Sequence, residues 1–141
     1  MSVVKIKSIT KVLFKKAYPF KAQLKLDKSW IGNSYGGFYV ATEFLTKDSI
    51  IYSFGIGKDI SFDTELITLK DCEVHAFDPT PKSLEWIESI NTPSKFSLHK
   101  YGVDIENRSR AFYLPENPEF VSGSIHQYEK LGSNYIEVPM K

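Results

Sequence analysis

Residues 49–59 read SIIYSFGIGKD, a β-branched and aromatic run that stops at the first of two glycines. A short apolar run bounded by glycine is typical of a buried strand, and glycines allow a tight turn after it. A helix is expected next, from about Ser61 to Leu69, with Ser61 as its candidate N-cap. Phe62, Leu66 and Leu69 fall near one face of that helix.

The same arrangement then repeats. A second strand is predicted over 73–77, and it ends at the sequence DPTP of residues 78–81. The next helix is expected from about Pro81 to Ile90, since proline is tolerated in a first turn, and a third strand follows at 96–102. Each connection has the length of a right-handed parallel crossover. The order predicts an α/β fold with a Rossmann-like, three-layer parallel sheet.

Weaker patterns flank this core. Two short extra strands are expected near the C-terminus, at 110–114 and 134–138, with a Gly/Ser-rich loop at 121–125 between them. Residues 4–14 fit a helix only loosely, because their β-branched content is high. Residues 30–38 are expected to form a loop, since glycine, asparagine and serine are frequent there.

Composition limits the class of protein. The chain has 141 residues and a mass of 16.1 kDa, with 42% hydrophobic and 25% charged residues, which suits one domain with a core and excludes a disordered chain. No run approaches the ~20 apolar residues of a membrane helix. The single cysteine, Cys72, excludes a disulfide framework and a cysteine zinc cluster. A reducing compartment, the cytoplasm, is therefore expected.

Charge is divided unevenly along the chain. Residues 1–28 contain eight lysines and one acid, a net charge of +7, so that the rest of the chain carries −6. One interpretation is a basic arm that contacts a polyanion or a membrane surface. The other is a lysine-rich surface helix packed on an acidic body.

The expected binding site lies where the first two strands end. Gly55 and Gly57 follow the first strand, and Asp78 follows the second, 23 residues after the first glycine. Ligands of doubly wound sheets bind at the carboxyl ends of the strands, and an acid at this spacing accepts hydrogen bonds from ribose hydroxyls. The sequence thus predicts a nucleotide site. A nicotinamide-type domain is disfavoured, because Ile60 stands where the longer glycine motif has its third glycine.

Several blocks together resemble the FkbM-type family of S-adenosylmethionine-dependent methyltransferases. The most specific are YSFGIGKDISFD at 52–63 and VHAFDPTP at 74–81. YGGF at 35–38, YGVD at 101–104, and YLPEN at 113–117 with SGS at 122–124 are also similar. The resemblance covers the chain from about Trp30 to its end, and it implies a class I methyltransferase fold, a transferase that uses S-adenosylmethionine.

At the methionine end of this cofactor, the resemblance places Gly55 and Gly57 beneath the ligand. It implies that Asp59 or Asp63 holds the ammonium group. At the other end of the cofactor, the resemblance implies roles for four residues. Asp78 would bind the ribose hydroxyls, Pro79 and Thr80 would border the adenine, and Asp104 would face the adenine amino group.

The chain also departs from the family pattern. Ser53 stands where the family's glycine loop opens with an acid, and Asp59 replaces the third glycine. The chain ends at about the point where the family's fourth central strand and its Asp-x-Glu-Gly stretch begin. The expected organisation is therefore a basic N-terminal segment, 1–29, and a truncated methyltransferase-like cofactor-binding domain, 30–141.

Two functions are consistent with these residues. One is methyl transfer to an oxygen of a sugar or small metabolite; the other is a catalytically inactive, shortened relative that acts as a binding or assembly module. No nucleic-acid partner is expected. No metal site is expected either, because the isolated histidines have no second ligand at helical spacing. His75 and His99 are expected as packed or surface strand residues, and His126 is a weaker candidate base.

The missing neighbour of the first strand has a structural consequence. In this fold the first strand lies between the second strand and the fourth. Because the expected fourth strand is missing, 50–54 is expected to be an uncovered apolar edge. Such edges recruit partners, and a homo-oligomer is expected. The alternatives are that the N-terminal segment or the last strand covers this edge.

Overall fold

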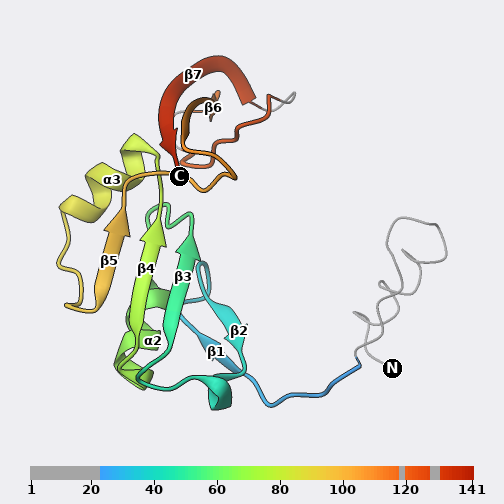
Figure 1. The fold of residues 1–141 in the computed structure, drawn as a ribbon, viewed down its shortest axis with the longest axis vertical. Helices are drawn as coiled ribbons and strands as arrows, with labels where there is room; N and C mark the ends of the chain where they lie inside the picture. Colours follow the sequence, from blue (N-terminus) through green and yellow to red (C-terminus); the bar gives the residue numbers. More distant parts are fainter. Residues whose placement is uncertain (1–22, 118–119, 128–130) are drawn as a thin grey trace.

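The computed structural model describes residues 23–117, 120–127 and 131–141. Its centre is a three-stranded parallel sheet in the order β3–β4–β5 (Figure 1). The elements of this core are β3 (Ile50–Phe54), α2 (Ser61–Lys70), β4 (Glu73–Phe77), α3 (Pro81–Glu88) and β5 (Phe96–His99). The predicted order of strands and helices is confirmed, and this small mixed α/β fold is compatible with a Rossmann-like core. The helix expected over 4–14 lies outside the described residues.

Two antiparallel pairs flank the sheet. The first consists of β1 (Ser29–Ile31) and β2 (Phe38–Val40), followed by the short 3-10 helix η1 (Thr42–Phe44). The expected loop over 30–38 is thus wrong at both ends. The second pair, β6 (Arg108–Pro115) and β7 (Leu131–Met140), confirms and extends the two strands expected near the C-terminus.

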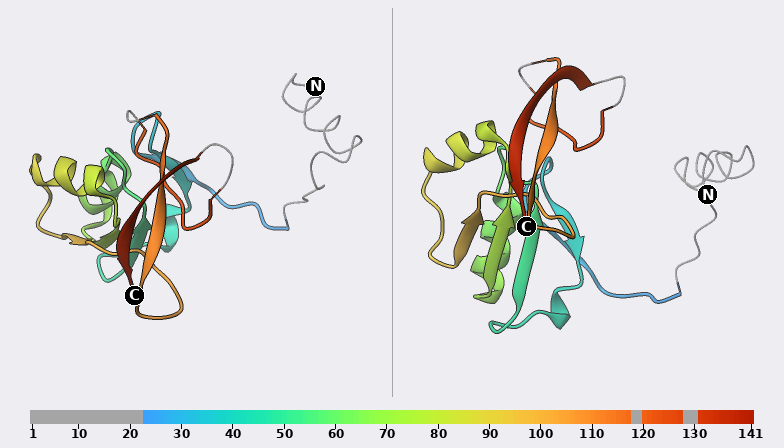
Figure 2. Two further views of the ribbon diagram at one scale, coloured as in Figure 1. Left: turned by 90° about the horizontal axis from the view of Figure 1, so that it is seen from above. Right: turned by 45° about the horizontal axis from the view of Figure 1, so that its top comes forward.

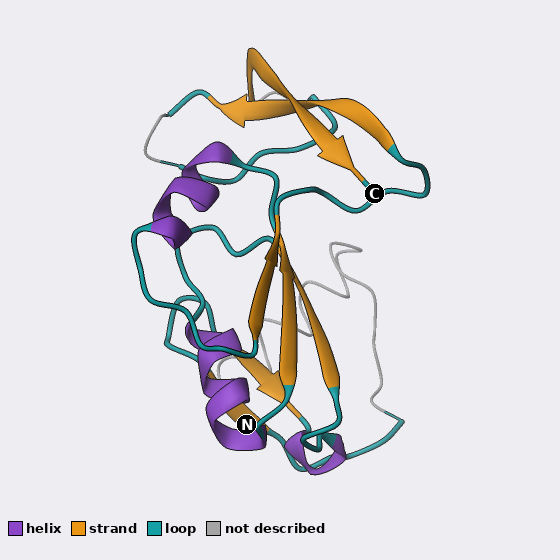
Figure 3. Ribbon diagram, turned by 60° about the vertical axis from the view of Figure 1, so that its left-hand side comes forward, coloured by secondary structure: helices purple, strands orange, loops and turns teal. Residues whose placement is uncertain are grey.

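Both helices of the core lie on the same side of the sheet (Figure 3). From α2, Ile67 packs on the same buried cluster as Ile87 of α3, and this cluster includes Val74 and Ala76 of the central strand. The reason is topological: two right-handed crossovers that advance in one direction place their helices on one face. The expected three-layer arrangement is therefore wrong for the described residues, which form two layers. Among these residues, no helix is long and apolar enough to cross a bilayer.

Helix α2 is rotated from the orientation that its sequence suggested. Leu66 is 1% exposed and packs with Ile31 and Cys72, whereas Leu69 is 55% exposed. The helix presents Ile67 to the sheet and Leu66 to β1, so its buried side lies between these two directions and away from Leu69. Leu69 therefore does not share a buried face with Leu66.

The cap of α2 also differs from the expectation. Ser61 is the first helical residue, and the N-cap position belongs to Ile60, which makes no side-chain cap. The Asp59 carboxylate accepts the backbone N–H of Ser61 at 2.7 Å and takes over this role from one position earlier.

The face of the sheet opposite the helices carries exposed aromatic and imidazole rings. Tyr52 lies against His75, and Phe54 stacks on Phe77 with ring centroids 5.2 Å apart. Because side chains alternate along a strand, β3 turns Ile50, Tyr52 and Phe54 to this open face. The expected full burial of this strand is therefore wrong; each of these three side chains is more than half exposed.

The outer edge of β3 has no strand partner within the described residues, as expected. β7 pairs with β6, and β1 pairs with β2. The alternative in which the last strand covers this edge is therefore wrong. Residues 1–22, the other expected cover, lie outside the described part of the chain.

The burial of Leu66 predicts a specific stability effect. Leu66→Ala should lower the free energy of unfolding by about 2–5 kcal/mol, because it removes methyl groups from a closed cluster and leaves a cavity. Leu69→Ala, on the exposed side of the same helix, should change it by less than about 0.5 kcal/mol. Urea denaturation of both variants measures the difference, and equal losses would contradict the orientation of α2.

Candidate functional site

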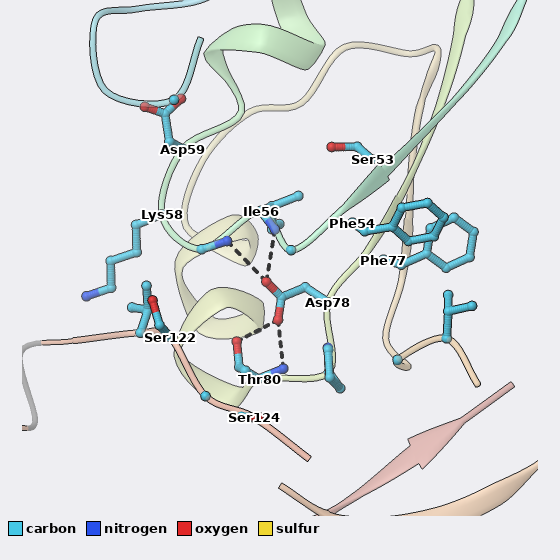
Figure 4. Close-up of a pocket in the computed structure, with 18 of the residues that line it drawn as sticks. Ser53, Phe54, Ile56, Lys58, Asp59, Phe77, Asp78, Thr80, Ser122 and Ser124 are labelled. Atoms are coloured by element: carbon cyan, nitrogen blue, oxygen red, sulfur yellow. Dashed lines mark hydrogen bonds between the residues drawn. The ribbon is translucent and has the colours of Figure 1, made fainter. Parts of the chain in front are cut away.

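A cavity of about 760 Å³ lies at the carboxyl ends of the three parallel strands. Its floor is formed by the β3–α2 turn and the residues after β4, and the wall facing this floor by β6 and the loop 121–125 (Figure 4). Figure 2 shows the β6–β7 pair beyond the ends toward which the sheet strands point. The volume is in the range of small-molecule sites, and the position is where α/β sheets bind ligands.

The β3–α2 turn is the floor of this cavity. Gly55 and Gly57 have φ angles of +78° and +54°, which residues with a Cβ rarely adopt. A Cβ on Gly55 would meet no surrounding atom within 4 Å, so the backbone here borders open space. The turn therefore presents bare backbone to the cavity, as the sequence predicted.

Asp78 joins the end of β4 to this turn. Its Oδ2 accepts the backbone N–H groups of Ile56 and Gly57 at 3.0 and 3.1 Å (Figure 4). Its Oδ1 accepts the backbone N–H and the hydroxyl of Thr80 at 2.8 and 2.6 Å. These four hydrogen bonds occupy the acceptor positions of a carboxylate that is 3% exposed.

The hydrogen bonds of Asp78 limit its capacity to bind ribose hydroxyls, the role expected from the sequence. The structure brings Asp78 against the glycine turn, as its spacing suggested, but the carboxylate is occupied by protein donors. A ribose hydroxyl would have to replace one of them, and the Thr80 hydroxyl is the one donor that can rotate away. Ribose binding by Asp78 stays a prediction. What the structure shows is that Asp78 holds the turn in shape.

Asp59 lies at the rim of the cavity and ties two loops together. Its carboxylate accepts hydrogen bonds from the side-chain amide of Asn33 and the backbone of Ser61. Burial alone would raise the pKa of Asp59, but hydrogen bonds from Ser61 and Asn33 outweigh it and lower the pKa below its ordinary value. Asp59 is therefore an ionised clamp between the β1–β2 turn and the start of α2.

Asp63, in the first turn of α2, also lines the cavity. It is 2% exposed, and Ser53 of β3 lies near it in the lining of the cavity. Its Oδ1 atom has no hydrogen-bond partner. Burial raises the pKa of Asp63, and the nearby charge of Asp59 adds to this effect, while the nearby Ser53 side chain opposes it.

Asp104 is not brought to the cavity. Its carboxylate instead bonds Arg108 at 2.8 Å and Arg110 at 3.2 Å, across the start of β6. The pKa of Asp104 is lowered, first by the backbone N–H of Ile105 and then by the arginines. Its neighbour Val103 lines the cavity in its place. The other expected positions, Pro79 and Thr80, do line it.

Several lining residues were not singled out by the sequence as ligand contacts. They are Phe54, Phe62, Phe77, Phe112, Val121, Ser122, Ser124, Ile125 and Met140. Phe54 and Phe77 are the last residues of β3 and β4. Their position at the strand ends was therefore predictable from the sequence. The contribution of Phe112 and Met140 depends on how β6 and β7 fold over the sheet ends, and no local pattern reports this.

The aromatic residues before β3 are divided between two places. Tyr35 and Phe38 line the cavity. Trp30 instead lies edge-on to Tyr39, with ring centroids 5.0 Å apart.

The histidines lie outside the lining of the cavity. His75 Nδ1 and His99 Nε2 are 2.9 Å apart on the open face of the sheet, and His126 is exposed. Cys72 is buried in the core, as expected. Across the described ranges, no group of three or more His, Cys, Asp or Glu residues is arranged to hold a metal ion.

No protein-family model matches the sequence, and comparisons with curated proteins and with solved structures found no match.

The bonds of Asp78 predict the effect of replacing it. Asp78→Asn should lower the free energy of unfolding by about 1–3 kcal/mol, because an amide group in place of one oxygen leaves buried donors without an acceptor. Asp48→Asn, at an exposed aspartate, should have an effect below about 0.5 kcal/mol. Chemical denaturation tests both, and an unchanged Asp78→Asn variant would show that the turn does not need this carboxylate.

Proposed function

We propose that this cavity binds S-adenosylmethionine, and that the chain is the cofactor-binding part of an O-methyltransferase acting on a sugar or small metabolite. The observation that carries the proposal is the glycine turn held against Asp78 at the carboxyl ends of β3 and β4. A backbone bare of Cβ atoms beside a cavity of about 760 Å³ suits an extended nucleoside ligand.

The lining of the cavity suits the chemical character of this ligand. Phe54 and Phe77 are stacked on neighbouring strands, and Tyr35, Phe38 and Phe112 add further rings. Aromatic rings favour contact with a flat base and with an organic cation. Among the described residues, three carboxylates, Asp59, Asp63 and Asp78, line the cavity against one lysine, Lys58. This excess of negative charge favours a positively charged ligand.

When bound, S-adenosylmethionine supplies a methyl group on a positively charged sulfur. The role of this chain is to position the cofactor: the turn at 55–57 supports it, and the rings enclose it. Positioning two reactants is the main requirement of methyl transfer by in-line displacement. On this proposal, the loop 121–125 and Met140, which also line the cavity, would border the acceptor.

A second function, that of a binding or assembly module without activity, is favoured by one observation. None of the histidines borders the cavity, so the residue type most often used as a general base is absent from its lining. Incubation of the purified chain with labelled S-adenosylmethionine and candidate sugars separates the two functions. Label in the acceptor supports the transferase, and cofactor binding without transfer supports the module.

The proposal predicts which ligand stabilises the fold. At 100 times its dissociation constant, S-adenosylhomocysteine should raise the free energy of unfolding by ~2.7 kcal/mol, while NAD should have no effect. A thermal shift assay measures this. Stabilisation by NAD alone would contradict the proposal, as would a protein that responds to neither ligand.

A matched pair of variants locates the binding. Ser122→Trp should abolish the stabilisation by S-adenosylhomocysteine, because Ser122 is exposed at the cavity wall and a large ring there fills the space. Ser94→Trp, at an exposed turn between α3 and β5, should retain it. Equal responses of the two variants would place the ligand elsewhere.

We also propose that a second copy of the chain pairs along the free edge of β3. This edge is unpartnered within the described residues, and Ile50 and Tyr52 leave apolar surface beside it. Unpaired strand edges with apolar side chains form strand pairs with other chains.

The pairing proposal predicts a concentration-dependent mass. Sedimentation should show a species of about twice the 16.1 kDa chain mass, and Ile50→Lys should shift it to the monomer, because a lysine disfavours edge pairing. Ile105→Lys, at a side chain that is 91% exposed in a loop, should leave the mass unchanged. A wild-type protein that stays monomeric at all concentrations would show this idea to be wrong.

A further inference from the structure

We infer that a second copy of this chain joins β3 in one defined register, antiparallel and centred on Tyr52, so that two three-stranded sheets become one sheet of six strands. In this register Phe54 of each copy lies opposite Ile50 of the other. The inference rests on the edge pairing proposed above, and it assigns the residues that make the pairing.

The backbone of β3 divides its polar groups between its two edges. The C=O of Ser49 and the N–H of Gly55 both form hydrogen bonds with the backbone of β4, at 3.3 and 2.8 Å. Successive residues of a strand direct their N–H and C=O groups to opposite sides, so the odd-numbered residues of β3 face β4. The residues that direct these groups to the outer edge, where no strand of the described residues pairs with them, are Ile50, Tyr52 and Phe54.

The outer edge of β3 has none of the features that keep edge strands from pairing. The strand contains no charged residue and no proline, the residue types that usually protect such an edge. The three residues with outward backbone groups are also the ones with exposed apolar side chains, at 54% for Ile50, 59% for Tyr52 and 63% for Phe54. Pairing along this edge therefore satisfies backbone hydrogen bonds and buries apolar surface at the same time.

Symmetry fixes the direction of the pairing. Two identical chains that close into a pair are related by a two-fold axis. The exposed side chains of both copies share one face only if this axis is perpendicular to the sheet, and the two β3 strands then run antiparallel. Opposite residues whose backbone groups face one another exchange two hydrogen bonds. With the axis at Tyr52, Tyr52 pairs with its own counterpart and Ile50 pairs with Phe54, so that every outward group of the strand is bonded.

The neighbouring registers leave backbone groups without a partner. A shift by one residue sets the outward groups against residues that already bond to β4. A shift by two in one direction sets Phe54 opposite Asp48, whose N–H donates to the Thr46 hydroxyl at 3.3 Å. The same shift in the other direction sets Ile50 opposite Ile56, whose N–H donates to the carboxylate that holds the glycine turn, at 3.0 Å. The register centred on Tyr52 is the one that avoids these conflicts.

The side chains favour the same register. Aromatic pairs and pairs of an aromatic with a β-branched residue stabilise antiparallel strands, and this register forms a Tyr52 pair on the axis and a Phe54–Ile50 pair on each side of it. Because the strands are antiparallel, the two cavities lie at opposite ends of the joined sheet. Phe54 lines the cavity of its own chain, so Ile50 of the second copy packs beside a residue of that lining.

Disulfide cross-linking tests the register. Opposite residues of a hydrogen-bonded antiparallel pair have Cα atoms about 5.5 Å apart, a distance that a disulfide spans. Tyr52→Cys should therefore form a covalent dimer on oxidation. Ile50→Cys and Phe54→Cys should each fail to cross-link alone, because each lies roughly 13 Å along the strands from its own counterpart, whereas an equal mixture of the two should cross-link. The wild-type protein, whose single cysteine Cys72 is buried, should give no covalent dimer.

The outcomes separate this register from the pairing itself. A wild-type protein that stays monomeric in sedimentation contradicts both. If the wild-type protein is dimeric and Ile50→Cys or Phe54→Cys cross-links with itself, the pairing stands and the register is wrong. A Tyr52→Cys protein that is dimeric in sedimentation but forms no disulfide on oxidation also overturns the register.

Hydrogen exchange in the wild-type protein keeps the inference testable if the cysteine variants do not fold or do not pair. Between dilute protein and a concentration at which the dimer dominates, the N–H groups of Ile50, Tyr52 and Phe54 should exchange at least roughly tenfold more slowly, because they become hydrogen-bonded. The N–H groups of Ile51 and Ser53, which face β4 in the single chain, should slow by less. A dimeric protein in which the N–H of Tyr52 exchanges at the same rate at both concentrations shows the register to be wrong.

Discussion

The carboxylate of Asp78 connects the two halves of the candidate site. A buried aspartate without a nearby positive charge is stable only if donors surround it, and here two come from the glycine turn and two from Thr80. The backbone at Gly55 and Gly57 is thereby held in left-handed conformations that would otherwise be sampled only part of the time. The cavity floor, the start of α2 and the end of β4 are placed by this one set of bonds.

The three acids of the cavity have different tasks because their surroundings differ. Asp59 is surrounded by donors and has a lowered pKa, so it acts as a clamp between loops. Asp78 accepts two hydrogen bonds from the turn that it supports and two from Thr80. Asp63 is buried and has a raised pKa, and its Oδ1 atom is free to accept a hydrogen bond. From residue type alone, the three aspartates could not have been distinguished.

The open face of the sheet follows from the same topology that builds the site. Because both crossovers advance in one direction, α2 and α3 cover one face and leave the rings of Tyr52, His75 and Phe77 on the other. The free edge of β3 borders that face. A chain with a cavity at the strand ends and an uncovered sheet face beside it has two separate surfaces for contacts.

Periodicity and turn residues were sufficient to predict the parallel core, the helices and the convergence of Gly55 with Asp78, because strand ends and crossovers are local properties of the sequence. The layer count, the rotation of α2 and the exposure of β3 were predicted wrongly, since they depend on which elements are available to pack on each face. The turn of Asp104 toward Arg108 and the unpartnered oxygen of Asp63 could be seen only in three dimensions. Both result from distances between residues on different elements, which no pattern along the chain encodes.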